Sequence, residues 1–430
     1  MKPAFSILER KRAGESLSEA EIRDLVAGAS AGASSSSWGD AELGAFLMAA
    51  AVRGLDLEET RALTLAMLES GEQWDLAADF PALVDKHSTG GVADTVSLIL
   101  APLLAACGVP VVMLTGRSLG HTGGTADKLE SIPGLRLDLD RAECCRLLDE
   151  VGTAIGVATG DIAPADRRLY ALRDRTATIS SIPLITASIA SKKLATGAAA
   201  LVFDVKTGNG AFLPDRAQGE ELARRLVETV EAAGRRSSAL VTDMNQPLGV
   251  WAGHTAEVRA TFEALEGEGA ADLMEVTYAL CEAVAEAVGQ PVSRRRLEDA
   301  VASGKGRDVF VRWAERQGAD PAWLAEPRFE LATVEVPLRA PGAGVLAGVD
   351  TTRLGLLLSR AARGSRTDID YGVSLRMVQR LGDELQEGQE LARLYLRRED
   401  EGLIAEAQGA FTIDPLADPE KVRPPLVERL

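Results

Sequence analysis

The sequence predicts a small all-α domain packed beside a mixed α/β domain, with a C-terminal α+β domain. Three patterns indicate this architecture. Apolar residues recur at helical spacing up to about residue 70. From about 80 to 320, short apolar runs alternate with helical patterns, which is typical of parallel βα units. Beyond about 330, short strand and turn patterns take over, and 430 residues suffice for three domains.

Helical spacing defines the first domain. Three helices are predicted near residues 18–28, 40–53 and 57–70. The first begins at a capping box, Ser18 with Glu21. A second helical stretch, Ala163 to Thr196, returns later in the chain. The predicted domains are therefore residues 1–70 and 160–196 (helical), 75–159 and 197–330 (α/β), and 331–430 (C-terminal). We expect a ligand cleft between the first two, because ligand sites concentrate at domain interfaces.

Short apolar runs define the strands of the α/β domain. They include Phe80–Val84, Val109–Leu114 and Ala199–Lys206. Residues 96–114 form an apolar stretch long enough to suggest a membrane span, but Pro102, Gly108 and Pro110 divide it into a helix and a strand. We therefore expect no membrane-spanning segment.

Two Gly-rich turns, residues 85–91 and 115–125, follow predicted strands and lead into helical patterns. Unpaired N–H groups and the helix dipole at such junctions favour phosphate. In and after the first turn, Lys86 adds a positive charge, and Ser88 and Ser97 add hydroxyl donors. The sequence therefore predicts an anion site, a local positive pocket in an acidic protein. A pair of ordinary βα turns is the alternative interpretation.

Two of the three histidines, His87 and His121, lie inside these turns. A bound anion would favour the protonated form of His87, which stands between Lys86 and Ser88, and would let it donate a proton or hydrogen bond. A structural role in the turn is the alternative, more so for His121. We expect His254 at the surface.

A second polar cluster falls on the predicted helix that follows residue 180. Ser188, Ser191 and Lys192 lie at i, i+3 and i+4 and so share one face. Arg173 lies shortly before this helix, and we expect Lys193 to point elsewhere, into solvent. One face of a largely apolar helix is therefore polar and cationic, although a surface lysine is the alternative for Lys192.

The composition narrows the class of protein. The net charge of −17 opposes a nucleic-acid or anionic-membrane surface, which needs a basic stripe. Four cysteines with no CxxC motif fit reduced thiols and a cytoplasmic location. The N-terminus has no apolar core of signal-peptide length.

Several common motifs are missing from the sequence. It contains no GxxxxGK[ST] stretch, which argues against a P-loop NTPase. Gly208-Asn209-Gly210 lacks the third glycine of a dinucleotide fingerprint. No HExxH motif or Cys/His cluster is present, so we expect no metal site.

Five motifs together resemble the thymidine/pyrimidine-nucleoside phosphorylase family, and they span almost the whole chain. They are Lys86-His-Ser-Thr-Gly-Gly-Val-Ala-Asp94, Gly116-Arg-Ser-Leu-Gly-His-Thr-Gly-Gly-Thr-Ala-Asp-Lys-Leu-Glu-Ser-Ile-Pro-Gly134, Leu172-Arg-Asp174, Ser181-Ile-Pro-Leu-Ile-Thr-Ala-Ser-Ile-Ala-Ser-Lys-Lys193 and Asp204-Val-Lys-Thr-Gly-Asn-Gly-Ala-Phe212. The second motif is highly specific to that family. The resemblance implies the three domains described above and a homodimer formed through the helical domain.

The resemblance also implies an activity: thymidine and phosphate would give thymine and 2-deoxyribose 1-phosphate. By the same likeness, phosphate would be held by Lys86, Ser88, Ser97, Thr115 and Thr125, and the pyrimidine by His87, Arg173, Ser188 and Lys192. His87, Arg173 and Lys192 would be the catalytic residues, because they can donate to the base as it leaves with negative charge. Inorganic phosphate is the expected co-substrate, and no cofactor is chemically required.

Two positions bear on details of this resemblance. Some family members hold a potassium ion with backbone carbonyls and a Glu; the corresponding positions here are Ala93, Thr95, Leu248, Trp251 and Ala260, so the acidic ligand is missing and the ion is doubtful. Met113 stands where enzymes that also accept uridine tend to have Lys, which predicts a preference for 2′-deoxynucleosides.

Other functions fit parts of the same pattern. A broad pyrimidine-nucleoside phosphorylase that includes uridine is one alternative. An anthranilate-type phosphoribosyltransferase is another, but it would need acidic residues for Mg²⁺-pyrophosphate at the cleft. An archaeal-type AMP phosphorylase carries an extra N-terminal domain, and a non-catalytic binding protein on the same scaffold is the last alternative.

Overall fold

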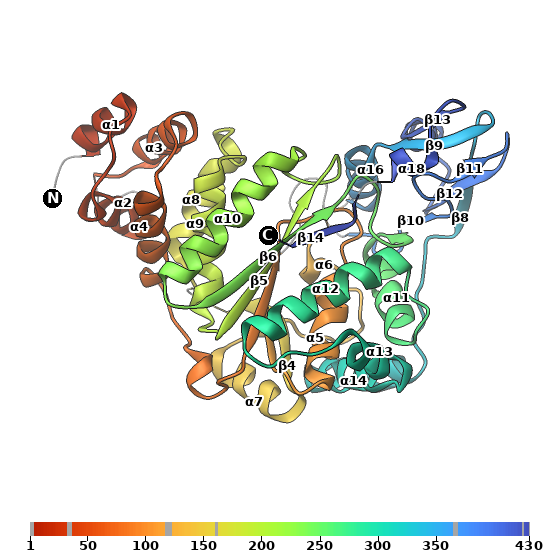
Figure 1. Cartoon of the computed structure of the whole chain (residues 1–430), viewed down its shortest axis with the longest axis horizontal. Helices are drawn as coiled ribbons and strands as arrows, with labels where there is room; N and C mark the ends of the chain where they lie inside the picture. Colours follow the sequence, from red (N-terminus) through yellow and green to blue (C-terminus); the bar gives the residue numbers. More distant parts are fainter. Residues whose placement is uncertain are drawn as a thin grey trace.

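The computed structural model describes residues 4–31, 37–116, 123–159, 162–363, 369–423 and 425–429. Helices α1–α4 lie at one end of the molecule, a seven-stranded sheet lies in the middle, and strands β8–β13 lie at the other end (Figure 1). Within the described ranges, no helix is both long and apolar enough to cross a membrane.

Six helices build the helical domain. They are α1 (Ala4–Ala13), α2 (Glu19–Ala31), α3 (Asp40–Arg53), α4 (Leu57–Glu69), α8 (Pro164–Arg175) and α9 (Ile182–Ala195). Trp38, Phe46 and Leu169 lie in their shared core. The sequence did not predict α1, because its buried side is narrow: Ala4, Ile7 and Lys11 are its buried residues.

The central sheet has the order β14-β6-β5-β1-β2-β4-β3. Its strands are β1 (Val84–Ser88), β2 (Val111–Leu114), β3 (Asp138–Leu139), β4 (Thr153–Ala158), β5 (Ala200–Thr207), β6 (Arg236–Asp243) and β14 (Val427–Arg429). All neighbouring pairs are parallel except β14 with β6. The chain continues from β1 to β2 on one side and later reaches β5 on the other. Ligands bind at the carboxyl ends of strands beside such a reversal of strand order.

Helices cover both faces of this sheet. On one face α10 (Arg216–Ala232) packs against β5, β6 and α9. On the other, α5 (Val96–Ala106) and α12 (Ala271–Ala287) pack together. The remaining elements are η1 (Leu76–Ala78), α6 (Thr125–Leu129), α7 (Arg141–Val151), α11 (His254–Leu265), α13 (Arg294–Ala302), α14 (Lys305–Arg316) and α15 (Pro321–Ala325). The apolar stretch 96–114 is thus a helix and a strand, as predicted, although Pro102 lies inside α5.

Helix α9 belongs to two cores at once. Leu184 and Ala187, near its start, pack in the helical domain. Ile189 and Leu194, nearer its end, pack with β5, β6 and α10. One rigid helix therefore carries Ser188 and Lys192 between the two domains, at the place where the cleft forms.

The C-terminal domain contains two small sheets, ordered β7-β10-β12-β8 and β11-β9-β13. Its elements are β8 (Val334–Arg339), β9 (Gly344–Val349), α16 (Thr351–Arg363), β10 (Ser374–Met377), β11 (Glu384–Leu385), β12 (Glu390–Leu396), α17 (Glu401–Gln408), β13 (Phe411–Asp414) and α18 (Pro419–Val422). Strand β7 (Trp251–Ala252) comes from the α/β part of the chain and pairs with β10.

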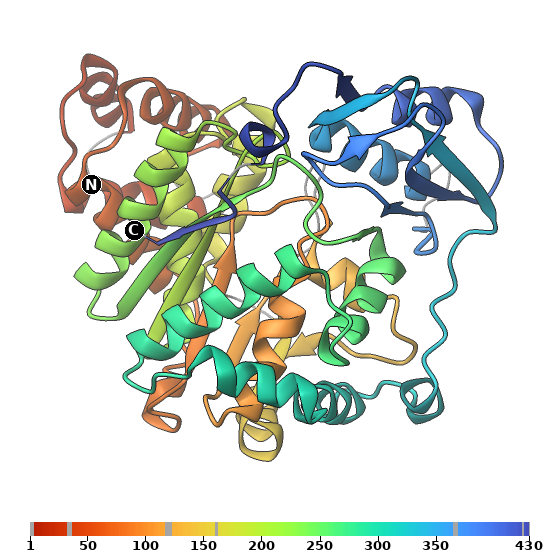
Figure 2. The ribbon, with the colours of Figure 1, turned by 45° about the vertical axis from the view of Figure 1, so that its right-hand side comes forward.

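The last strand, β14, returns to the central sheet, where Figure 2 shows it beside the long strands β5 and β6. Together, β7 and β14 cross the predicted boundary at residue 331 in opposite directions. Asn209 adds a further link, because its amide donates to the carbonyl of Val349 at 2.9 Å and accepts the N–H of Thr351 at 2.7 Å. The Gly208-Asn209-Gly210 motif therefore connects two domains.

A buried ion pair joins α1 to α4. The ammonium of Lys11 lies 2.8 Å from the Glu59 carboxylate, and the two side chains are 4% and 2% exposed. Glu59 also accepts the N–H of Leu17 at 2.8 Å. The helical domain therefore depends on this carboxylate.

We predict that Glu59→Ala lowers the free energy of unfolding of the helical domain by roughly 3–5 kcal/mol, because it leaves the buried Lys11 charge without a partner. Glu58→Ala is the matched control, since that side chain is 75% exposed and its loss should cost little. Urea-induced unfolding measures both. Equal midpoints for the two variants would contradict the prediction.

Candidate active site

A cleft of about 950 Å³ lies between the helical and α/β domains. All nine site residues predicted from the sequence line it: Lys86, His87, Ser88, Ser97, Thr115, Thr125, Arg173, Ser188 and Lys192. Met113, 3% exposed on β2, lines it too. The structure thus brings together residues from β1, β2, α5, α6, α8 and α9.

The first turn lies later in the chain than the sequence predicts. Residues 85–88 belong to β1, because each of them pairs with β5. The turn itself covers residues 89–95, before α5 begins. Gly90 has φ of +96°, which favours glycine. At Gly91 a Cβ would lie 2.3 Å from the Met244 side chain, so the turn packs closely against the loop after β6.

Lys86 is buried and contacts a carboxylate and a hydroxyl. Its ammonium lies 3.0 Å from Asp204 and donates to the Ser97 hydroxyl at 3.2 Å. Lys206 lies 2.9 Å from the same Asp204 oxygen, and Thr242 donates to the other oxygen at 2.7 Å. Lys86 therefore shares its charge with a carboxylate and a second lysine.

Asp94 makes several hydrogen bonds that hold the first turn in place. Its carboxylate accepts the Ser88 hydroxyl at 2.6 Å and the Val96 N–H at 3.2 Å. Its backbone carbonyl accepts the ammonium of Lys128 at 2.6 Å. Burial alone would raise the pKa of Asp94, but the ammonium groups of Lys206, Lys86 and Lys128 outweigh it and lower the pKa below its ordinary value.

The lysines around the first turn lie close to carboxylates. Lys128 pairs with Glu257 at 2.7 Å, and Lys206 lies 3.8 Å from Asp94. Three lysines (Lys86, Lys128, Lys206) thus face three carboxylates (Asp94, Asp204, Glu257). Burying three lysines in one place requires such compensating carboxylates.

The second turn is described only at its ends. Thr115 extends β2, with its N–H donating to the Gly156 carbonyl at 2.8 Å, and Thr125 begins α6. Residues 117–122, including His121, lie outside the described residues.

Arg173 lies on the opposite wall of the cleft, in α8, and is 2% exposed. Its guanidinium donates to the carbonyls of Thr178 at 3.4 Å, Leu184 at 3.1 Å and Ile179 at 2.6 Å. Burial lowers the pKa of Arg173. An arginine has five N–H donors, so Arg173 holds the α8–α9 connection with three and retains two for other partners.

Lys192 lies beside Arg173 on the same wall. Its ammonium donates to the carboxylate of Asp166 and to the Ser188 hydroxyl at 2.8 Å. The ring of Tyr170 lies under both cations, 5.4 Å from the guanidinium of Arg173 and 6.0 Å from the ammonium of Lys192. The Ser188 hydroxyl accepts from Lys192 and so can donate into the cleft.

The prediction that Lys193 is solvated is wrong. Lys193 is 4% exposed and lies 2.8 Å from Asp85, and it donates to the Leu114 carbonyl at 3.2 Å. It therefore ties α9 to β1 and β2. Burial raises the pKa of Asp85 to about 6, although the Lys193 ammonium opposes the rise.

His87 is half-buried at the end of β1. Burial, and then the ammonium groups of Lys193, Lys192 and Lys86, hold its pKa well below the ordinary value of 6.5. The histidine is therefore neutral at neutral pH before an anion binds. A bound anion would raise its pKa.

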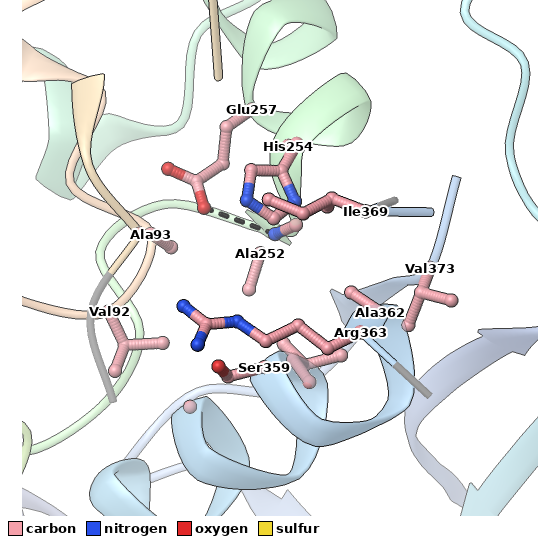
Figure 3. Close-up of a pocket in the computed structure, with 14 residues that line it drawn as sticks. Val92, Ala93, Ala252, His254, Glu257, Ser359, Ala362, Arg363, Ile369 and Val373 are labelled. Carbon is pink, nitrogen blue, oxygen red and sulfur yellow. Dashed lines mark hydrogen bonds between the residues drawn. The ribbon is translucent and has the colours of Figure 1, made fainter. Parts of the chain in front are cut away.

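The expectation that His254 lies at the surface is wrong. It begins α11, packs against Tyr371 with ring centroids 5.5 Å apart, and burial lowers its pKa. It lines a small cavity of about 50 Å³, where Arg363 reaches from α16 toward Val92 and Ala93 (Figure 3). This cavity lies behind the first turn.

The positions that the resemblance links to potassium offer no free carboxylate. Ala260 lies in α11 and has no side-chain oxygen. The two carboxylates of α11 are engaged, Glu257 by Lys128 at 2.7 Å and Glu263 by Arg259 at 2.7 Å. These residues do not fit a potassium ion held by an acidic ligand.

Sequence reasoning missed the acidic partners in the site, although two signals were present. Asp204 and Lys206 alternate along β5 and so share one face of a buried strand, which indicates paired charges. Asp166, Tyr170 and Arg173 lie at i, i+4 and i+7 on α8 and so share one helix face.

Comparison with known proteins identifies the general class first. Residues 81–306 match the sequence model described as "Glycosyl transferase family, a/b domain", and residues 5–71 match the one described as "Glycosyl transferase family, helical bundle domain". The structure is similar to that of anthranilate phosphoribosyltransferase from Thermus thermophilus, with a TM-score of 0.60 and 20% identity, covering 74% of this chain and 99% of that one. At this identity the likeness shows the fold alone.

Two curated relatives identify the family within this class of glycosyl transferases. The chain is 42% identical over 435 residues to a thymidine phosphorylase of Rhizobium meliloti (strain 1021), covering 98% of this chain and 97% of that one. It is 39% identical over 403 residues to a pyrimidine-nucleoside phosphorylase of Geobacillus stearothermophilus, covering 91% and 92%. The chain belongs to the thymidine/pyrimidine-nucleoside phosphorylase family, which confirms the resemblance and the predicted fold class.

We predict that His87 titrates well below pH 6.5 in phosphate-free protein and that saturating phosphate raises its midpoint, because the anion offsets the lysines around it. With three histidines in the sequence, NMR of labelled imidazole rings can follow each one, and His87→Gln assigns the signal. A midpoint at or above 6.5 without phosphate, or no change on adding it, would contradict the prediction.

Proposed function

We propose that this protein catalyses the phosphorolysis of pyrimidine nucleosides, with thymidine preferred, to give thymine and 2-deoxyribose 1-phosphate. The proposal rests on one observation: two kinds of hydrogen-bond donors line opposite walls of a single cleft. Hydroxyls and a lysine suited to phosphate line the α/β wall, and Arg173, Ser188 and Lys192 line the helical wall. The names of the relatives support the same reaction.

The geometry suggests how the reaction runs. Lys86, Ser97, Thr115 and Thr125 would hold phosphate so that one of its oxygens attacks the anomeric carbon. As that C–O bond forms, the C–N bond to the base breaks and its electron pair moves onto the pyrimidine. Donors on the opposite wall stabilise this developing charge on the carbonyl oxygens of the base. Hydrogen phosphate thus gives a sugar phosphate monoanion and a base anion, which then takes up a proton.

An assay of base release tests this function. Thymidine, deoxyuridine and uridine are incubated with and without inorganic phosphate, and free base is measured. We expect release to require phosphate. Release without phosphate, or with pyrophosphate only, would refute the proposal and would favour the phosphoribosyltransferase alternative.

We also propose that no cofactor is required, because displacement at the anomeric carbon needs donors and a bound anion only. EDTA should leave the rate unchanged, and sodium and potassium phosphate should give equal rates. The engaged carboxylates of α11 support the absence of a potassium requirement. Loss of activity with EDTA or in sodium salts would show the opposite.

Lys192 is proposed to donate to the leaving base. Lys192→Ala should lower kcat/KM for thymidine by roughly 10²–10³-fold, as expected for a donor aimed at developing charge. The fold should survive, because the Lys192 side chain is 41% exposed. Arg173→Ala makes a less clean test, since Arg173 also holds three carbonyls. Near-normal turnover by Lys192→Ala would remove this residue from the site.

Met113 is proposed to set the preference for deoxyribose. Its thioether offers a ribose 2′-hydroxyl no strong partner, and a hydroxyl left unpaired costs roughly 1–3 kcal/mol. We predict kcat/KM for deoxyuridine about 10- to 100-fold above that for uridine, which carries the same base. Met113→Lys should shrink this ratio. A ratio near one in the wild type, or an unchanged large ratio in the variant, would refute the role of Met113.

We further propose a homodimer formed through the helical domain. Phe5, Met48 and Val52 are apolar and 70%, 43% and 72% exposed, and they lie on the packed helices α1 and α3. Val52→Asp should shift the protein toward monomer in sedimentation equilibrium, because burying a carboxylate in an apolar interface is costly. Leu416→Asp, at a 91% exposed position of the C-terminal domain, should stay dimeric. A monomeric wild type would refute this proposal.

The proposed location is the cytoplasm. Cys107, Cys144, Cys145 and Cys281 are all free, as is usual for proteins in a reducing compartment. Fractionation of cells that express the chain tests this proposal, and recovery outside the cytoplasm would refute it.

A further inference from the structure

The anion site contains a carboxylate and a hydroxyl that cannot donate to an anion as they are placed. The Ser88 hydroxyl gives its one proton to Asp94 at 2.6 Å and accepts the N–H of Gly90 at 3.2 Å. A hydroxyl has one donor and two acceptor positions, so Ser88 retains a single acceptor. Asp94 accepts hydrogen bonds only, and both residues line the cleft.

Asp94 is held in this position from three sides. Its carboxylate bonds to Ser88 and to the Val96 N–H, and Lys128 holds its backbone carbonyl at 2.6 Å. Its side chain is 8% exposed, and Lys206 lies 3.8 Å away. Turning Ser88 toward a ligand would therefore leave an Asp94 oxygen facing an anion with no proton between them.

The lysines nearby are already paired with other carboxylates. Lys86 and Lys206 share Asp204, at 3.0 and 2.9 Å, and Lys128 is paired with Glu257 at 2.7 Å. An incoming anion therefore meets lysines that already have partners, and it also meets the Asp94 carboxylate. A proton on the ligand makes its contact with Asp94 favourable, because a P–OH group can donate a charge-assisted hydrogen bond to a carboxylate.

We propose that Asp94, with the Ser88 hydroxyl that it holds, selects oxyanions that carry a proton, so that the site takes hydrogen phosphate or hydrogen arsenate and discriminates against dianions without an O–H group. Asp94 is thus a specificity-determining residue of the anion site. The proposal rests on the proposed function for its assignment of the anion as phosphate. In the reaction, the P–OH group faces Asp94 and leaves an unprotonated oxygen free to attack the sugar.

Monofluorophosphate is a suitable probe, because it matches hydrogen phosphate in charge and shape but has fluorine in place of the hydroxyl. Dissociation constants for phosphate, arsenate, monofluorophosphate and sulfate are measured by calorimetry at neutral pH. We expect arsenate to bind like phosphate, and monofluorophosphate and sulfate to bind roughly 10- to 100-fold more weakly, as for one hydrogen bond replaced by facing acceptors. A wild-type ratio of monofluorophosphate to phosphate dissociation constants below ten would overturn the proposal.

Two variants separate the acceptor from its charge. Asp94→Asn keeps an oxygen for the Val96 N–H and places an amide donor near the ligand, so the ratio should fall at least threefold. Glu257→Gln removes an equal charge from the same network at a residue that does not line the cleft, so the ratio should fall less than threefold. A smaller fall in Asp94→Asn, or an equally large one in Glu257→Gln, would overturn the proposal.

These measurements do not depend on turnover. If base release is absent with every nucleoside while the anion ratios follow the expectation, the proposed function fails and the selectivity of Asp94 stands. If phosphorolysis occurs but the wild-type ratio is below ten, the function stands and the selectivity is refuted. Circular dichroism checks that each variant is folded before its anions are titrated.

Discussion

The compensation of buried charge at the carboxyl edge of the central sheet constrains the rest of this structure. Lys86 and Lys206 approach one carboxylate, Asp204, and the strands that carry them are adjacent and parallel. Uncompensated burial of any of these groups would cost several kcal/mol. The strand pairing and the position of the first turn are therefore tied to the same set of charges.

Under the proposed function, this constraint explains how the cleft would bind an anion inside an acidic protein. Hydroxyl and N–H donors are held in place by charged groups that neutralise one another, so binding depends on where donors and acceptors point. Asp94 and Lys128 are the clearest example. The ammonium of Lys128, on α6, donates to the Asp94 backbone carbonyl, and the Asp94 carboxylate accepts a hydrogen bond, so the first turn is fixed against α6. In the proposal above, selectivity among anions then depends on whether the ligand carries an O–H group.

The helical wall of the cleft is held by a different set of contacts. Arg173 and Lys192 are set by one helix pair, with Asp166 holding Lys192 and backbone carbonyls holding Arg173. Because α9 packs in both domains, the two walls of the cleft share a rigid element. The C-terminal domain is joined to the α/β domain by β7 and β14, which pair across the domain boundary.

The sequence by itself determined the fold class, the family and nine candidate residues that line the cleft, because helical spacing, glycine position and family motifs are local properties of the chain. The tertiary structure decided which charges meet. Lys193 shows the difference: its helix position suggested solvent, yet it lies against Asp85 of β1. Periodicity fixes the face on which a side chain lies, whereas its partner depends on packing between segments far apart in sequence, and for Lys86, Asp94 and Asp204 that packing sets the chemistry of the site.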